Sequence, residues 1–263
     1  MSFTFSEGLR NRMAQGFGFA RSLHNGYIDI RSGAKPLSAD IAASSSGISL
    51  GIVSIGSATL SKETIATATL TVTGTAQVLG SVKIGTLPIV ANPDRVDATA
   101  TASTASGAVA LAGAINTSGI ARATVSGSVV TVYAPPGVGA DWNGLALATT
   151  GLTCTGSNFA SGVAGANGLY LAQPAAGVIA KPSGVVWSCA AIAAGTAGWF
   201  RFYSSDTADT GGAITTLTEP LFARMDGSVG VGSGDLQLSS LAFTTGPANT
   251  VTVDVASFTM PAQ

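Results

Sequence analysis

Short runs in which apolar and polar residues alternate dominate both ends of the chain. Alternation with a period of two is typical of β-strands that bury one face. Gly-rich turns separate the runs, and strands of this kind predict a sandwich or a barrel. The predicted strands are residues 27–31, 48–55, 168–173, 185–192, 197–204, 222–231, 234–241 and 250–258.

The strongest of these runs is residues 197–204, with the sequence AGWFRFYS. Side chains two positions apart lie on the same face of a strand. Trp199, Arg201 and Tyr203 are therefore expected on one face, and Phe200 and Phe202 on the other.

The N-terminal segment, residues 3–23, has a helical pattern. Leu9, Met13 and Phe17 recur at helical spacing, and Ser6 is a suitable N-cap. Gly16 lies inside the pattern and weakens it, by about 1 kcal/mol relative to Ala. We expect a helix here whose second half is the weaker part.

The middle of the chain, residues 57–164, differs in composition, with only eight charged residues and an excess of Thr, Ala and Val. Strands are predicted at 67–73, 78–84, 145–148 and 152–155, and a hairpin joins 121–125 to 129–133. A helix is predicted from about Ser103, with Val109, Ala112 and Ile115 or Leu111 facing inward and a stop near residue 116. This order of elements indicates a small α+β module.

The two segments that flank this middle region resemble each other in composition and pattern. Neither contains enough strands for a domain of its own. We therefore predict a base domain made of residues 1–56 and 165–263, with residues 57–164 inserted as a second domain. The predicted fold class is mainly β: an antiparallel β-sandwich-like base with an N-terminal helix and an inserted small α+β domain.

Charge is scarce: 263 residues include 12 Lys and Arg, 13 Asp and Glu and a single His, against 34 Gly. An enzyme needs convergent acids, bases or metal ligands, and this chain offers few. The net charge of −1 provides no basic field for nucleic acid. The composition favours a structural protein that packs against other copies or other proteins.

No signal-peptide pattern opens the sequence, and no run reaches the roughly 18 apolar residues of a membrane-spanning helix. We expect neither a leader nor a membrane partner. Cys154 and Cys189 share no short spacing, so a metal site is not expected and buried free thiols are the simplest interpretation. A disulfide between them stays open.

Two groups of residues are candidates for chemistry. His24 is the only imidazole, but no nucleophile elbow accompanies it, so a surface or capping role is favoured. The densest acids are Asp206, Asp209, Glu219, Asp226 and Asp235. Paired carboxylates hydrolyse glycosides, and acids also bind calcium, but Asp in Gly- and Thr-rich loops mostly makes its own turn hydrogen bonds.

Two further groups are candidates for an interaction surface. Trp199 and Tyr203 share a strand face and are able to stack on sugar rings, although such aromatics more often fill a core or a subunit contact. Arg10, Arg12 and Arg21 give the N-terminal segment a basic side that either pairs with acids of a neighbouring protein or is solvated.

Several sequence blocks occur in the order found in small virion proteins of tailed bacteriophages, and the flanks resemble that family. The blocks are LRN at 9–11, GYIDIRSG at 26–33 with KP at 35–36, GTAGWFRF at 195–202, GSVG at 227–230 and GDLQL at 234–238. The middle region is similar to an α+β module of phage tail and surface proteins, through AIN at 114–116, residues 121–133 and WNGLAL at 142–147.

The resemblance implies a non-enzymatic structural component of a virion, without catalytic, cofactor-binding or metal-binding residues. The first expectation is a capsid decoration or cement protein, a homo-oligomer that contacts other copies of itself and the major capsid or tail proteins. The alternative is a tail-, collar- or fibre-associated protein that touches the host surface. A glycan-degrading enzyme is a remote alternative.

Overall fold

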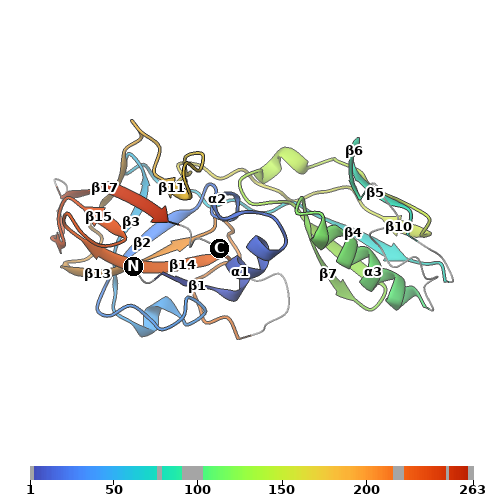
Figure 1. Cartoon of the computed structure of the whole chain (residues 1–263), viewed down its shortest axis with the longest axis horizontal. Coiled ribbons are helices and arrows are strands. Elements are labelled where there is room, and N and C mark those ends of the chain that lie inside the picture. The colour runs from blue at the N-terminus through green and yellow to red at the C-terminus, as the bar shows by residue number, and fades with distance from the viewer. Residues whose placement is uncertain (1–2, 76–78, 91–102, 216–221, 247–248, 260–263) are drawn as a thin grey trace. The chain divides into compact units, whose positions relative to one another are not determined.

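The computed structural model describes residues 3–75, 79–90, 103–215, 222–246 and 249–259. The described part is mainly β, as predicted. The chain divides into two compact units (Figure 1): Met1–Asn11, Phe19–Lys62 and Gly165–Gln263 form the first, and Arg12–Gly18 and Glu63–Ala164 form the second. The second unit thus begins at residue 63 rather than 57, and it includes residues 12–18, which the sequence had placed in the base.

Seven strands of the first unit close into a barrel. Around the barrel they are β13 (Gly195–Tyr203), β2 (Tyr27–Ser32), β3 (Ser49–Ile55), β12 (Trp187–Ala190), β17 (Thr250–Thr259), β15 (Leu236–Leu238) and β14 (Arg224–Gly230), which pairs with β13 again. All neighbours are antiparallel except β14 and β15, which are parallel. The base is therefore a closed barrel rather than two stacked layers. Figure 1 shows its strands drawn from the blue and the orange-to-red parts of the chain.

Shorter elements of this unit are β1 (Thr4–Phe5), α2 (Phe19–Ser22), the 3-10 turn Ala43–Ser45, β11 (Val178–Ala180) and β16 (Ala242–Phe243). The helix predicted over 3–23 is broken into α1 (Glu7–Ala14) and α2, because Gly16 and Gly18 adopt positive φ. Ser6 caps α1 as predicted, since its hydroxyl accepts a hydrogen bond from the backbone N–H of Leu9 at 3.2 Å. The strand predicted at 168–173 does not form, and only a single bridge joins Leu169 to Gly26.

Aromatic contacts identify the interior of the barrel. The ring of Phe200 lies 6.5 Å from that of Phe258, and the ring of Phe202 lies 6.3 Å from that of Trp187. β13 is not a neighbour of β17 or β12 in the sheet, so these contacts cross the barrel interior. Phe200 and Phe202 face inward. Because side chains alternate along a strand, Arg201 between them faces outward.

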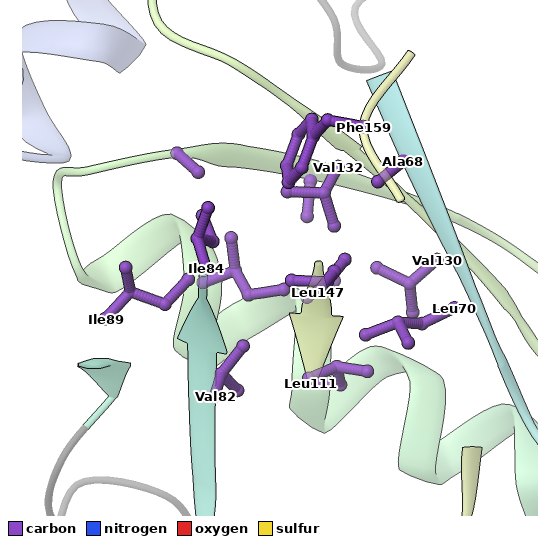
Figure 2. Packing of buried hydrophobic residues seen from close by; sticks show 14 of the residues in the cluster. Ala68, Leu70, Val82, Ile84, Ile89, Leu111, Val130, Val132, Leu147 and Phe159 are labelled. Carbon is purple, nitrogen blue, oxygen red and sulfur yellow. The ribbon is translucent and has the colours of Figure 1, made fainter. Parts of the chain in front are cut away.

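Where residues 63–164 are described, they form an α+β arrangement of two small sheets and one helix. Strands β10 (Cys154–Gly156), β4 (Thr67–Val72), β8 (Val129–Tyr133) and β7 (Arg122–Ser126) form one sheet, and β6 (Leu87–Val90), β5 (Ser81–Ile84) and β9 (Leu147–Thr150) form the other, with α3 (Thr104–Thr117) and the 3-10 turn Gly139–Trp142. Figure 2 shows Leu70, Ile84, Leu111, Val130 and Leu147 from both sheets and the helix converging on one aliphatic core. The predicted hairpin is confirmed as β7 and β8.

The helix α3 begins as predicted, with a capping box in which Ser103 and Ser106 exchange side-chain and backbone hydrogen bonds. Its buried stripe contains Leu111, Ala112 and Ile115, as expected. Val109 was wrongly predicted to face inward, and it is 62% exposed. Ala108 takes the inward position, because a spacing of three and four residues from it reaches Leu111 and Ala112.

A side chain covers one residue of an edge strand in the second unit. The amide of Asn116 accepts from the backbone N–H of Ala123 at 2.7 Å and donates to its carbonyl at 3.0 Å. Ala123 lies on β7, which is a terminal strand of its sheet. The Asn116 side chain thus occupies the hydrogen-bonding positions that another strand would use, and this blocks edge-to-edge association there.

Both cysteines are free, Cys154 in the second unit and Cys189 in the first, and Cys189 is buried. Burial, with a smaller contribution from Asp29, raises the pKa of the Cys189 thiol to about 12. None of the helices in the described ranges has the length and apolar composition to span a membrane.

The two thiols are expected to differ sharply in reactivity. At pH 8 the Cys189 thiol is protonated, because the pH is far below its raised pKa, and its burial excludes reagent. We expect Ellman's reagent to modify Cys154 alone in the native protein and both cysteines in guanidinium chloride. Rapid modification of a native Cys154→Ser variant would contradict this assignment.

The first unit is expected to fold without the second. The two connections out of it run as an antiparallel pair, in which Ser61 and Ala166 exchange backbone hydrogen bonds of 3.0 and 2.9 Å. Replacing residues 63–164 by a short Gly-Ser link should retain the β-rich circular dichroism and a cooperative thermal transition. Some stability should be lost, because residues 12–18 lose the unit to which they belong. A non-cooperative remainder would show instead that the two regions share one core.

Candidate functional site on the outer face of the barrel

Charged and aromatic side chains form an ordered array on the outer face of β2, β13 and β14. Strand register places Arg201 of β13 between Asp29 of β2 and Asp226 of β14. The same register forms the neighbouring rows Tyr27–Tyr203–Arg224 and Arg31–Trp199–Ser228. The predicted common face of Trp199, Arg201 and Tyr203 is therefore confirmed.

Arg201 and Asp226 form a fully buried, two-pronged ion pair. Arg201 Nε donates to Asp226 Oδ1 at 2.6 Å, and Nη2 donates to Oδ2 at 2.7 Å. Burial raises the pKa of the Asp226 carboxyl, and the bonds from Arg201 offset part of that rise. A carboxyl whose pKa is raised on folding stabilises the fold at acid pH, and this contribution is lost as the pH rises through the raised pKa. The ionised pair therefore serves position more than stability.

Two further Arg–Asp pairs lie beside the first. Arg224 binds Asp209 with two hydrogen bonds of 2.9 and 2.5 Å, and both side chains are buried. Arg31 Nη1 donates to Asp29 Oδ2 at 2.7 Å, while the hydroxyl of Ser49 donates to Oδ1 at 2.5 Å. The array contains three cations and three anions, so its charges balance.

The three guanidinium groups also hold two loops, which we name the first loop (residues 33–48) and the second loop (residues 204–215). Each guanidinium uses a further N–H on a loop carbonyl: Arg201 on Ile41 at 2.7 Å, Arg31 on Gly47 at 2.8 Å and Arg224 on Gly212 at 2.7 Å. The first loop also accepts from the indole N–H of Trp199 through the carbonyl of Ser46 at 3.1 Å. The outward face of these strands is buried for this reason.

The two loops are also bonded to each other. The backbone N–H of Ala43 donates to the carbonyl of Gly211 at 3.2 Å, and that of Ile214 donates to the carbonyl of Asp40 at 2.8 Å. Lys62 Nζ donates to the carbonyl of Asp209 at 2.9 Å. Loops fixed in this way present a preformed surface.

A polar cleft of about 300 Å³ lies between the two loops and the barrel wall. Tyr27, Asp29 and Arg31 line it from the barrel, Ser44 from the first loop and Gly211 from the second. The rings of Tyr27 and Tyr203 are stacked at 4.8 Å, and Lys62 Nζ lies 4.8 Å from the ring centre of Tyr27. Burial, together with Tyr203, Asp209 and Asp29, raises the pKa of Tyr27 far above its ordinary value, so its hydroxyl stays protonated.

The residues proposed as an interaction surface are dispersed. Trp199 is 0% exposed and Tyr203 3%, so neither ring lies on the surface of the chain. Arg10 and Arg21 are exposed, but Arg12 is buried, so the three do not form one basic side. Alternation along the strand identified the shared face, but it did not show that the loops cover that face.

The candidate acids have structural partners. Asp209 and Asp226 are held by arginines, and Asp235 accepts from the backbone N–H of Ser228 at 2.9 Å and from its hydroxyl at 2.8 Å. Asp206 accepts from the backbone N–H of Ala208, in the turn role expected of Asp. Glu219 lies outside the described residues. The described ranges contain no group of three His, Cys, Asp or Glu placed to hold a metal ion.

His24 is exposed, and its ring lies 6.5 Å from that of Tyr170. Asp29, Arg31 and Arg224 also belong to the array, and they were not predicted from the sequence. A signal was present, since the DIR run at 29–31 and the RMD run at 224–226 each place opposite charges on one face of a predicted strand.

No family model matches the chain, and neither the curated proteins nor the solved structures include a match.

The Arg201–Asp226 pair is expected to show strong coupling in a double-mutant cycle. Arg201→Met leaves the buried carboxylate of Asp226 without its cation, so the free energy of unfolding should fall by about 3–5 kcal/mol. Asp226→Leu should cost a similar amount, and the double variant should lose clearly less than the two single losses added. Urea denaturation measures all three.

The matched control is Arg10→Met, the same substitution at an exposed arginine, which should change stability by no more than about 0.5 kcal/mol. Additive losses at positions 201 and 226 would contradict a direct interaction between the two side chains.

Proposed function

We propose that this protein is a non-enzymatic structural component of a tailed-bacteriophage virion, and most simply a capsid decoration protein. The proposal rests on the resemblance of the flanking sequence blocks and on the way the fold uses its charges. In this proposal the protein forms homo-oligomers and binds other virion proteins through repeated contacts.

The burial of charged side chains is the observation that supports this proposal most strongly. Among the described residues, ten charged side chains are buried: Arg12, Asp29, Arg31, Glu63, Arg122, Arg201, Asp209, Arg224, Asp226 and Asp235. Charged side chains are rarely buried in globular proteins unless they are paired. A chain that is already poor in charge therefore has even fewer charges on its surface, which suits close packing with neighbours and little dependence on salt.

Exposed apolar side chains add to this picture. In the first unit Leu37 is 91% exposed, Ile48 54% and Ile192 59%. Leu37 and Ile48 belong to the first loop, which Arg31 and Arg201 hold in place. A fixed loop loses little conformational entropy when it is buried in a contact, which favours binding. Many weak contacts of this kind, repeated over a lattice, add up through multivalency.

The same surface suits a tail-, collar- or fibre-associated protein, which is the alternative proposal. The glycan-degrading alternative has less support, because Asp209, Asp226 and Asp235 are engaged by arginine or by turn hydrogen bonds.

The copy number per particle tests the proposal. We expect quantitative mass spectrometry of purified particles, with the major capsid protein as internal reference, to find this chain in hundreds of copies, as a decorated lattice requires. About a dozen copies or fewer would contradict decoration and support the tail-associated alternative. Absence from particles would contradict the virion proposal as a whole.

A further inference from the structure

We propose that the cleft between the two loops binds an uncharged, hydroxyl-rich ligand, such as one sugar residue. The inference concerns a binding activity of the first unit and does not rest on the role in a virion. It depends on the shape of the cleft, on its charge balance and on one buried donor.

The buried donor is Arg31 Nε. The side chain of Arg31 is 9% exposed, and its Nε has no hydrogen-bond partner among the described residues, although both Nη atoms are engaged by Asp29 and Gly47. A buried donor without a partner costs about 1–3 kcal/mol. Arg31 is one of the residues that line the cleft, so this unmet donor lies beside it.

The charges of the cleft favour an uncharged ligand. Asp29 and Arg31 both line the cleft and neutralise each other. The neighbouring charges are also paired, Arg201 with Asp226 and Arg224 with Asp209. Lys62 lies against the ring of Tyr27. Burial lowers the pKa of its ammonium group, and the nearby Asp209 and Asp206 offset part of that lowering. An anionic ligand would meet the Asp29 carboxylate, and a cationic ligand would meet Arg31.

A hydroxyl group suits the Asp29–Arg31 pair because it donates to a carboxylate and accepts from a guanidinium at the same time.

Stacking on an aromatic ring is not the mode of recognition. One face of the Tyr27 ring is occupied by Tyr203, and Lys62 also packs against that ring. Recognition would rest on directed hydrogen bonds from Asp29, Arg31 and rim hydroxyls such as those of Ser44 and Thr210.

The cleft is also preformed. Its walls are fixed by the ion pairs and by the bond between Ala43 and Gly211, so binding would require little reordering of the loops. Its volume of about 300 Å³ lies at the small end of ligand sites, which suits one sugar ring and millimolar affinity.

Saturation-transfer-difference NMR on the intact chain tests the inference, with glucose, galactose, mannose and N-acetylglucosamine as probes. The blocking variant is Ser44→Trp, at an exposed position that lines the cleft, and the matched control is Ser45→Trp, at the next exposed position, which does not line it. We expect transfer to at least one sugar in the wild type and the control, and binding weaker by about tenfold or more in the blocking variant.

If Ser44→Trp loses the wild-type thermal transition, Thr210→Trp blocks the cleft from the second loop, again at an exposed position. Disaccharides of any sugar that binds separate two sources: tighter binding indicates a residue within a glycan chain, and equal binding indicates a free sugar.

Three results would overturn the inference. They are no transfer to any probe in the wild type, equal transfer in the blocking variants, or displacement of the sugar by millimolar sulfate, which would assign the cleft to anions. None of them bears on the copy number in particles, so this inference and the proposed function fail separately.

Discussion

A guanidinium withdrawn from water has to be matched by carboxylates and carbonyl oxygens, and this requirement organises the first unit. Arg201 lies at the centre of the outer face of three strands, paired with Asp226 and next to Asp29. The strands alone satisfy only part of its hydrogen-bonding capacity, and the carbonyl of Ile41 accepts a further bond. Arg31 and Arg224 repeat this arrangement with Gly47 and Gly212. The loops are therefore a structural part of the barrel wall, because their carbonyls accept hydrogen bonds from these guanidinium groups.

This arrangement links sequence composition to the proposed role. A chain with few charges commits many of them to internal pairs, so the exterior depends on Ser, Thr, backbone groups and isolated apolar side chains. Such a surface has weak long-range fields, and contacts made with it depend on shape and on fixed loops. The closed barrel adds to this, since a closed sheet has no long open edges, and Asn116 covers the backbone of Ala123 on an edge strand of the second unit.

Periodicity predicted most strands, the hairpin of the second unit and the shared face of Trp199, Arg201 and Tyr203, because each depends on neighbours in sequence. It failed where a distant segment decides the outcome. Alternation along β13 shows which side chains share a face, but the burial of Trp199 depends on the first loop, more than 150 positions away. Closure of the barrel depends on the parallel pairing of β14 with β15, which no local pattern encodes. In the same way, small and apolar residues lie on several sides of α3 around Val109, and only packing showed which stripe faces the core.

The two loops are fixed parts of the barrel wall. Hydrogen–deuterium exchange of the wild-type protein tests this most directly, at the backbone amides of Ala43 and Ile214, which bridge the loops. The account predicts that these two amides exchange as slowly as amides of the barrel strands, because they open only when the ion pairs separate. Exchange at the rate of an unstructured loop would contradict it, and would mean that the Arg–Asp pairs do not hold the loops in solution.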